Sequence, residues 1–183
     1  MDIRELSAAT LYKTGAFVLQ DPQLLRISLR DNIRLARPDA TDEQVCAAAQ
    51  KAQIWQVIEE LPHGLDTVFG AETHLSGGQA QRIAIARALL ADSPVLILDE
   101  ATAFAAPESE AQIQAALNEL VVGRTVLVIA QKLDTIRQAN KIVALNHQGQ
   151  VEDIGTHAEL YSRGGTYQRF WDERAKATGS QLT

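Results

Sequence analysis

The segment Val95–Glu100 constrains the fold of this chain more than any other stretch. Four consecutive apolar residues are followed at once by two acidic residues, Asp99 and Glu100. A short apolar run of this kind is typical of a parallel strand that is covered on both faces. Open α/β sheets bind their ligands at the carboxyl ends of such strands. The segment therefore predicts a buried strand that carries two carboxylates to a ligand-binding edge.

The two carboxylates admit two interpretations. Neighbouring acids repel each other unless a cation or a shared proton lies near them. In the first interpretation, Asp99 holds Mg²⁺ and Glu100 polarises a water molecule that attacks a phosphate. In the second, the strand merely ends in an acidic loop. The segment taken alone leaves both open.

The rest of the chain alternates predicted strands and helices, which indicates an α/β domain with a mostly parallel sheet. Further strands are expected over 16–19, 125–130, 141–145 and 151–155, and the strands over 16–19 and 125–130 are expected to be buried. Helices are expected from the capping box at Thr41 to Leu61, from Ser76 to Pro94, from Pro107 to Gly123, over 134–139, from Thr156, and over 166–176.

A second candidate site lies at the start of one of these helices, in Leu75-Ser76-Gly77-Gly78-Gln79. Two glycines let backbone N–H groups approach an anion closely, and the helix N-terminus adds donors and partial positive charge. The alternative is an ordinary capped helix that follows a loop. Arg82 and Arg87, further along this helix, are expected to form ion pairs rather than to contact a phosphate.

Composition narrows the class of protein. The chain has 183 residues and a net charge of −6, which suits one globular domain and argues against nucleic acid as a partner. Its longest apolar runs, 45–49 and 126–130, are far shorter than the roughly 20 residues of a membrane-spanning helix. The single cysteine, Cys46, excludes an internal disulfide. A soluble, cytoplasmic, single-domain protein is expected.

Taken together, the segments at 75–79 and 95–100 resemble the signature motif and the Walker B motif of the ATP-binding cassette (ABC) ATPases. Gln20, within Val18–Pro22, resembles the glutamine of the Q-loop in this family. Gln131, after the strand over 125–130, stands where the family has its switch histidine. The resemblance extends from Asp2 to about Arg174.

The resemblance implies a P-loop NTPase-type fold, with a mostly parallel sheet and a helical signature subdomain, that is incomplete at the N-terminus. Residues 1–26 would be a remnant of the catalytic core with the Q-loop, and residues 27–90 the helical subdomain. Residues 91–176 would be the rest of the core, with Walker B and the switch loop, and residues 177–183 a flexible tail.

The resemblance also implies roles for individual residues. Two ABC cassettes face each other head to tail, and each binds ATP and Mg²⁺ against the signature motif of the other. The γ-phosphate of a nucleotide bound mainly by the partner would be contacted by Ser76, Gly77, Gly78 and Gln79. The implied Mg²⁺ ligands are Asp99 and Gln20, and the implied catalytic residues are Glu100, Gln20 and Gln131.

Three departures from the family pattern bear on activity. No G-x-x-x-x-G-K-[ST] phosphate loop occurs in the sequence. Gln131 can donate a hydrogen bond to a phosphate but cannot carry an imidazolium charge. Ala106 stands where the family has the aspartate of its D-loop. The chain is therefore expected to begin inside a cassette and to be inactive alone, although it is an ABC-type ATPase by family.

Two functions follow from the resemblance. The first is a cassette fragment of an exporter-type ABC transporter, which couples ATP binding and hydrolysis to transport in the complete protein. The alternative is a non-catalytic partner or scaffold that supplies its signature motif to a complete cassette. Either would work beside a transmembrane domain, on an upstream segment or a separate chain, at the inner face of the cell membrane.

The absent part of the cassette also has a consequence for folding. In the family, the Walker A strand lies between the strands expected here at 125–130 and 141–145. Its removal would leave unpaired strand edges and a marginal, aggregation-prone or partner-dependent fold. Alternatively, those two strands would pair directly.

Overall fold

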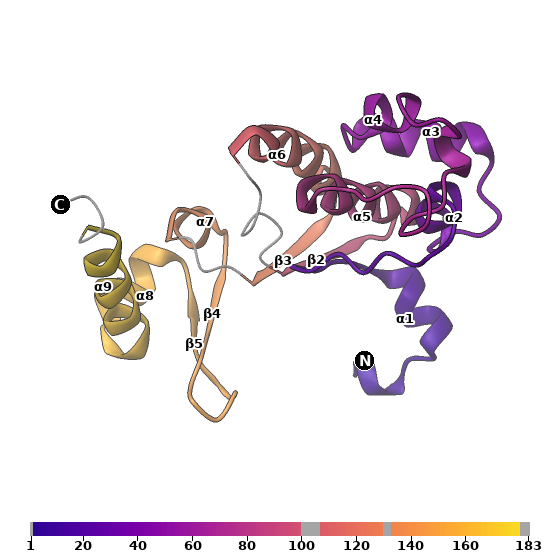
Figure 1. Ribbon diagram of the computed structural model, residues 1–183. Coiled ribbons are helices and arrows are strands. Elements are labelled where there is room, and N and C mark those ends of the chain that lie inside the picture. The colour runs from indigo at the N-terminus through magenta and orange to yellow at the C-terminus, as the bar shows by residue number, and fades with distance from the viewer. Residues whose placement is uncertain (1, 100–106, 130–132, 180–183) are drawn as a thin grey trace. The chain divides into compact units, whose positions relative to one another are not determined.

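The computed structural model describes residues 2–99, 107–129 and 133–179 (Figure 1). The chain forms two compact units, residues 1–129 and residues 130–183. The predicted subdomain boundaries after residues 26 and 90 both fall inside the first unit, and they stay predictions. The expected α/β class is confirmed, because the first unit combines a parallel sheet with helices.

The sheet of the first unit has three parallel strands. Strands β1 (Gly15–Val18), β2 (Val95–Asp99) and β3 (Thr125–Ile129) lie in the order β1-β2-β3. Val18 pairs with Leu98, and Leu98 pairs with Val128, so all three strands end at the same edge of the sheet. The predicted strands at 16–19 and 95–98 are confirmed.

The first unit has a helix, α5 (Gly77–Ala91), against which three other helices, α2 (Leu29–Arg34), α3 (Asp42–Lys51) and α6 (Pro107–Val121), pack. Its further helices are η1 (Ile3–Glu5), α1 (Ala8–Thr14), α4 (Trp55–Glu59) and η2 (Gly64–Asp66). Helix α5 contacts α2, α3, α6 and β1, as Figure 1 shows. Its Ile83 and Ile85 are fully buried, as is Leu96 of β2. Ile113 of α6 exposes only 1% of its surface. Helix α5 therefore forms the centre of the core.

The single helix predicted from Thr41 to Leu61 is wrong in its second half. The capping box between Thr41 and Gln44 is present, but α3 ends at Lys51 and α4 begins at Trp55. Gln53, between them, has a φ of 58°, which lies in the left-handed region and stops a right-handed helix. Helix-favouring composition therefore did not decide the path of the chain here.

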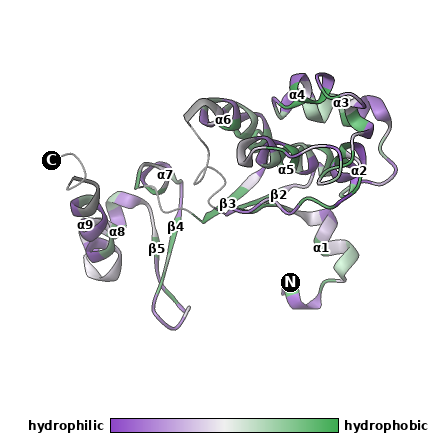
Figure 2. Ribbon diagram, viewed as in Figure 1, coloured by the Kyte–Doolittle hydropathy of each residue, from purple (hydrophilic) through white to green (hydrophobic). Residues whose placement is uncertain are grey.

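The predicted burial of three strands also needs correction. Along β1, Ala16 and Val18 are buried, whereas Phe17 is 46% exposed. Along β2, the side chains of Leu96 and Leu98 are buried, whereas Val95, Ile97 and Asp99 are half-buried. Strand β3 is largely exposed, although it is as apolar as β2 (Figure 2). The physical reason is that β3 is an edge strand and α5 covers only one face of the sheet, so the opposite face stays accessible in the described chain.

The second unit contains an antiparallel hairpin and three helices. Its elements are α7 (Leu133–Gln138), β4 (Ile142–Leu145), β5 (Val151–Gly155), α8 (His157–Arg163) and α9 (Gly165–Gly179). The predicted strands at 141–145 and 151–155 and the cap at Thr156 are confirmed, whereas α9 runs three residues beyond Lys176 into the expected tail. Direct pairing of the strands at 125–130 and 141–145 is not found, because β3 and β4 belong to separate sheets.

Candidate functional site

The carboxyl edge of the three-stranded sheet brings together two of the predicted site residues. Asp99 is the last residue of β2, and Gln20 follows the end of β1 by two positions. Since β1 and β2 are parallel neighbours in register, both residues lie at the same edge. Both side chains are half-buried, so they can reach a ligand there.

Two of the predicted catalytic residues, Glu100 and Gln131, lie outside the described residues, as does Ala106. In the sequence, Glu100 directly follows β2, and Gln131 follows the end of β3 by two positions. Gln20 is therefore the one member of the predicted catalytic set that the structure places.

The Ser76–Gln79 turn forms the start of α5 and is built as a reciprocal cap. The backbone N–H of Ser76 donates to Gln79 Oε1 at 2.9 Å, and the N–H of Gln79 donates to Ser76 Oγ at 3.2 Å. Both side chains are thus engaged in holding the helix N-terminus in shape. The N–H groups of Gly77 and Gly78 are among those that α-helix geometry leaves without an intrahelical acceptor.

The two glycines of this turn differ in their surroundings. A Cβ on Gly78 would lie 2.6 Å from Ser109 Cβ and 2.7 Å from Ser109 Oγ, so a glycine is required for α5 to approach α6. A Cβ on Gly77 would meet no atom within 4 Å, and Gly77 is exposed. Packing therefore explains Gly78, whereas Gly77 leaves open space over the backbone at the helix start.

The described residues fit a nucleotide with Mg²⁺ in part. Open space at Gly77 would let a phosphate oxygen approach the backbone N–H groups of the turn, where the helix dipole favours an anion. Mg²⁺ is commonly held by one or two carboxylates together with phosphate oxygens, and Asp99 offers one such carboxylate. Within the described part of the chain, His, Cys, Asp and Glu form no cluster of three or more that could hold a metal ion unaided.

Three polar side chains of α5 donate hydrogen bonds to backbone carbonyls of neighbouring segments. Gln81 Nε2 donates to the carbonyl oxygen of Leu19 at 3.2 Å. Arg82 donates to the carbonyl oxygens of Gly78 and Gln53, and Arg87 donates to those of Asn32 and Gln23. Among the described residues, the ion pairs predicted for Arg82 and Arg87 are not found, because both guanidinium groups donate to backbone carbonyls.

Burial also shifts the charge equilibrium of these two arginines. Loss of solvation lowers the pKa of Arg82 and that of Arg87 below the ordinary arginine value. Both are cationic, since the arginine guanidinium is not deprotonated in proteins. They therefore place positive charge in the interior beside α5.

Sequence reasoning missed one buried residue, Asn32 of α2, which is fully inaccessible to solvent. Its Oδ1 accepts from the N–H of Leu25 at 2.9 Å, and its Nδ2 donates to the carbonyl oxygens of Leu25 and Ser28 at 2.9 Å and 3.1 Å. The amide thus shapes the chain that leads from Gln20 into α2. Its position between the buried Leu29 and Ile33 gave no signal of this role.

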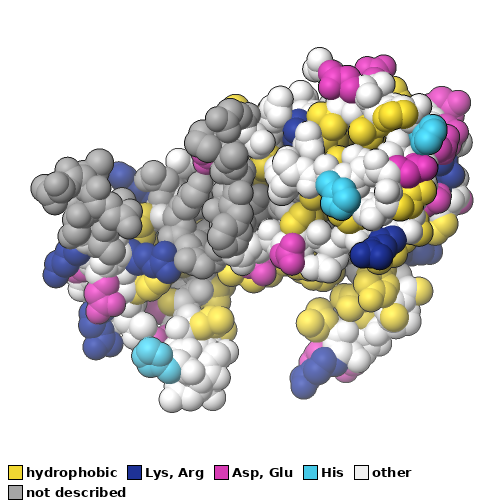
Figure 3. Space-filling view, viewed as in Figure 1, with side chains coloured by type: hydrophobic (Ala, Val, Ile, Leu, Met, Phe, Trp, Pro, Cys, Tyr) yellow, Lys and Arg dark blue, Asp and Glu magenta, His cyan; other side chains and the backbone are white. Residues whose placement is uncertain are grey.

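Ion pairs surround the start of α3, where acidic side chains gather on the surface (Figure 3). Arg30 NH1 lies 2.6 Å from Asp42 Oδ2, and Arg30 Nε lies 2.9 Å from Asp66 Oδ1. Hydrogen bonds from Arg34 and Arg30 lower the pKa of Asp42, and a hydrogen bond from Arg30 lowers that of Asp66. These contacts tie α2 to α3 and η2, away from Gln20 and Asp99.

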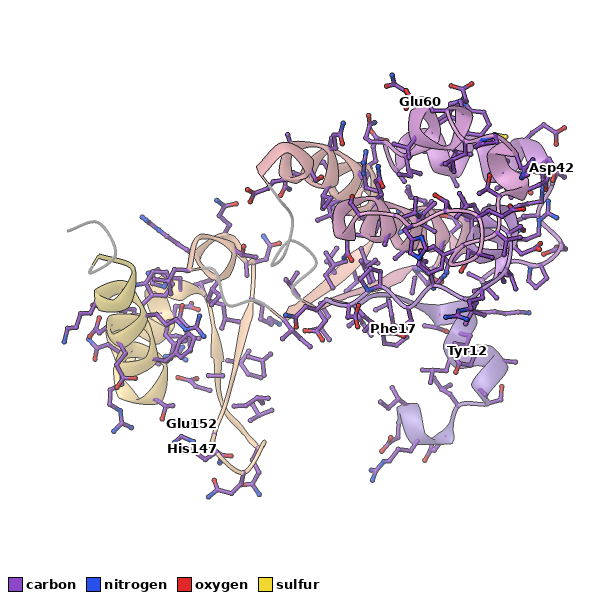
Figure 4. The ribbon with its side chains drawn as sticks, viewed as in Figure 1. Tyr12, Phe17, Asp42, Glu60, His147 and Glu152 are labelled. Atoms are coloured by element: carbon purple, nitrogen blue, oxygen red, sulfur yellow. The ribbon has the colours of Figure 1, made fainter. Side chains whose placement is uncertain are left out.

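An open cavity of about 460 Å³ lies elsewhere on the first unit. Tyr12 of α1 and Phe17 of β1, both labelled in Figure 4, contribute to its apolar walls, and Arg87 contributes a guanidinium group. Neither Gln20 nor Asp99 lines this cavity. It is therefore separate from the candidate nucleotide site.

Comparison with known proteins gives a family and several relatives. The family model described as "ABC transporter" matches residues 2–103. The mycobactin import ATP-binding/permease protein IrtA of Mycobacterium tuberculosis is 56% identical over 171 residues, covering 93% of this chain and 20% of the relative. The ATP-dependent lipid A-core flippase of Legionella pneumophila (strain Philadelphia 1) is 46% identical, covering 93% of this chain and 29% of the relative.

A solved structure agrees with the sequence relatives. The structure of a bacterial Atm1-family ABC exporter with ATP bound superposes with a TM-score of 0.80 at 35% identity. It covers 96% of this chain and 31% of the exporter chain. The chain therefore spans less than a third of the length of each of these relatives.

Proposed function

This chain belongs to the ABC transporter family, and from that premise we propose that it acts as part of the ATP-binding cassette of an exporter-type transporter. Its α/β fold is that of an exporter nucleotide-binding domain. The observation that carries the proposal is the Ser76–Gln79 turn, which is held in shape by its own cap and is open at Gly77. In the complete transporter, ATP binding and hydrolysis at such cassettes would drive transport.

The proposed site divides its residues between two nucleotides. The Ser76–Gln79 turn would donate backbone hydrogen bonds to the γ-phosphate of an ATP held mainly by a second cassette, arranged head to tail. Asp99 would bind Mg²⁺ with Gln20 beside it, and Mg²⁺ would neutralise phosphate charge when bound. Glu100 would orient or deprotonate the attacking water, and Gln131 would donate a hydrogen bond to the γ-phosphate.

We also propose that this chain does not hydrolyse ATP by itself. A phosphate loop and its lysine supply several charge-assisted hydrogen bonds, each contributing about 1.5–3 kcal/mol. The sequence has no such loop, and a general base has no effect without a positioned substrate. As a non-catalytic partner, such a chain could still place its Ser76–Gln79 turn against the ATP of a complete cassette.

The proposed partners include a transmembrane domain. None of the helices in the described part of the chain is long and apolar enough to cross a bilayer. One relative, IrtA, is named as an ATP-binding/permease protein, and another is named as an ATP-dependent flippase. We propose that this chain works at the inner face of a membrane, against a transmembrane domain on an upstream segment or a separate chain.

Two measurements test the proposal. Calorimetric titration of the chain with Mg-ATP should show no micromolar binding, and micromolar binding would contradict inactivity of the chain alone. The chain is then mixed with the complete ATP-binding domain of the lipid A-core flippase, and ATP turnover is measured. Co-elution and a raised turnover rate are expected.

The matched variants for this mixture are Gly77→Val and Ala111→Val. Gly77→Val should abolish the rise in turnover, because its side chain fills the space over the turn without touching other residues. Ala111→Val also introduces a valine, at an exposed position of α6, and should leave turnover unchanged. Equal stimulation by both variants would contradict the role of the turn.

A further inference from the structure

One buried glutamine of α5 is not used by the proposed site. Gln81 exposes only 5% of its surface, and its Nε2 donates to the carbonyl oxygen of Leu19 at 3.2 Å. Its Oε1 is buried, and no donor within the described residues reaches it. An unpartnered buried oxygen is unfavourable, and an apolar side chain of similar size would avoid that cost. Packing alone therefore does not explain a glutamine here.

Gln81 lies close to both parts of the candidate site, the carboxyl edge of the sheet and the Ser76–Gln79 turn. The carbonyl that it holds belongs to Leu19, the residue between the end of β1 and Gln20. Gln81 itself lies within the second turn of α5, two residues after Gln79. A single hydrogen bond therefore joins the carboxyl edge of the sheet to the start of α5.

The residues around Gln81 strengthen this link. Arg82, the next residue, donates to Gly78 within the turn and to Gln53 in the strained connection between α3 and α4. Arg87 donates to Gln23, four residues beyond Leu19, at 3.3 Å. The loop that carries Gln20 is thus held to α5 at two points, and Gln81 is the point nearest the turn.

We infer that Gln81 is a positioning residue that fixes the Ser76–Gln79 turn relative to Gln20 and the carboxyl edge of the sheet. The inference rests on the proposed function, in which the turn meets a nucleotide held by a second cassette. Backbone donors stabilise a phosphate only when they are held within roughly 0.5 Å of the productive geometry. A turn that could shift along the sheet would still bind the partner cassette but would support turnover poorly.

The test uses Gln81→Met, which keeps the volume of the side chain and removes both polar atoms. In the cassette mixture, its maximal stimulation of ATP turnover should fall at least about fivefold, because donors displaced by a fraction of an ångström lose most of their effect. The chain concentration that gives half-maximal stimulation should stay within about twofold, and the unfolding midpoint within about 2 °C. Gln114→Met, exposed on α6, is the control and should change nothing.

A purely structural role makes the opposite prediction. If Gln81 only fills space, Gln81→Met should be neutral or stabilising and should leave maximal stimulation unchanged. Gln81→Leu, which likewise lacks both polar atoms, should behave like Gln81→Met. Unchanged maximal stimulation in both variants would overturn the inference.

Hydrogen exchange on the chain alone separates this inference from the proposed function. If the wild-type chain fails to stimulate the cassette, the proposed function fails, and exchange decides the role of Gln81. Gln81→Met should speed exchange at the amides of Gln20 and Gln79 by about tenfold or more, with Leu96 of β2 unchanged. Unchanged exchange at Gln20, or equally faster exchange at Leu96, would overturn it.

Discussion

At the scale of single residues, the two glycines of the Ser76–Gln79 turn separate packing from ligand access. Gly78 lies against Ser109 of α6 so closely that no other residue fits, whereas Gly77 has free space. The pattern Ser-Gly-Gly in the sequence does not distinguish them. Only the position of α6 assigns Gly78 to the interior.

We predict that Gly78→Ala lowers the free energy of unfolding by about 1–3 kcal/mol, because its Cβ would overlap Ser109 and push the two helices apart. Gly77→Ala is the matched control and should be neutral or should stabilise by up to about 1 kcal/mol, since alanine favours helix and meets no atom. Urea denaturation of both variants measures the difference. Equal stability of the two variants would contradict the assigned contact.

At the scale of elements, α5 organises the first unit. Its apolar residues fill the core, and its polar side chains Gln81, Arg82 and Arg87 hold two backbone segments that have no regular structure of their own. One of these segments is the break between α3 and α4, which replaces the continuous helix expected from the sequence. The bond from Arg82 to Gln53 shows where that break is fixed.

We predict that Gln53→Gly raises the free energy of unfolding by about 0.5–1 kcal/mol. Gln53 has a φ of 58°, and glycine adopts this conformation without the steric cost that a Cβ imposes. The bond to Arg82 survives, because it uses the backbone carbonyl of residue 53. Gln50→Gly, in the exposed last turns of α3, should instead lower stability by about 1 kcal/mol.

Thermal unfolding monitored by circular dichroism compares the two variants. A destabilising Gln53→Gly would show that this position is not strained. A neutral Gln50→Gly would show that α3 contributes little to stability.

At the scale of the whole molecule, apolar sheet surface is accessible. On β3, Leu127 is 54% exposed and Ile129 is 52% exposed, and Phe17 of β1 is 46% exposed. Phe17, Ile97 and Leu127 stand in register across the three strands, on the face opposite the buried Leu96 and Leu98. Parallel sheets are normally covered on both faces, so this surface favours association. This surface is a reason for the sequence-based expectation of an aggregation-prone or partner-dependent chain, which stays a prediction.

We predict that Leu127→Lys reduces self-association of the purified chain, measured as the fraction of heavy species in sedimentation velocity at several concentrations. The lysine places a charge on the apolar row and interferes with edge pairing. Because Leu127 is already half-exposed, the free energy of unfolding should change by less than about 1 kcal/mol.

Val122→Lys is the control for this prediction. Val122 is 73% exposed directly after α6 and does not belong to the sheet, so the substitution should leave self-association unchanged. If both variants self-associate to the same extent, the row across β1, β2 and β3 is not the associating surface.

The sequence by itself determined many of the elements and the family. The apolar run before Asp99 predicted β2, the capping box at Thr41 and the caps at Ser76 and Thr156 predicted three helix starts, and the motifs at 75–79 and 95–100 predicted an ABC cassette. These features depend on residues close together in the chain. Local propensity and hydrogen bonding therefore specify them.

Only the tertiary structure decided burial and contact. It showed that β3 is exposed, that α3 ends before Ala52, and that the arginines of α5 bind carbonyls rather than acids. It also showed that Gln81 donates a hydrogen bond to the carbonyl oxygen of Leu19, which is 62 residues away in the sequence. The physical reason is that these properties depend on which segments meet in space, and a side chain of given polarity can be satisfied by many partners.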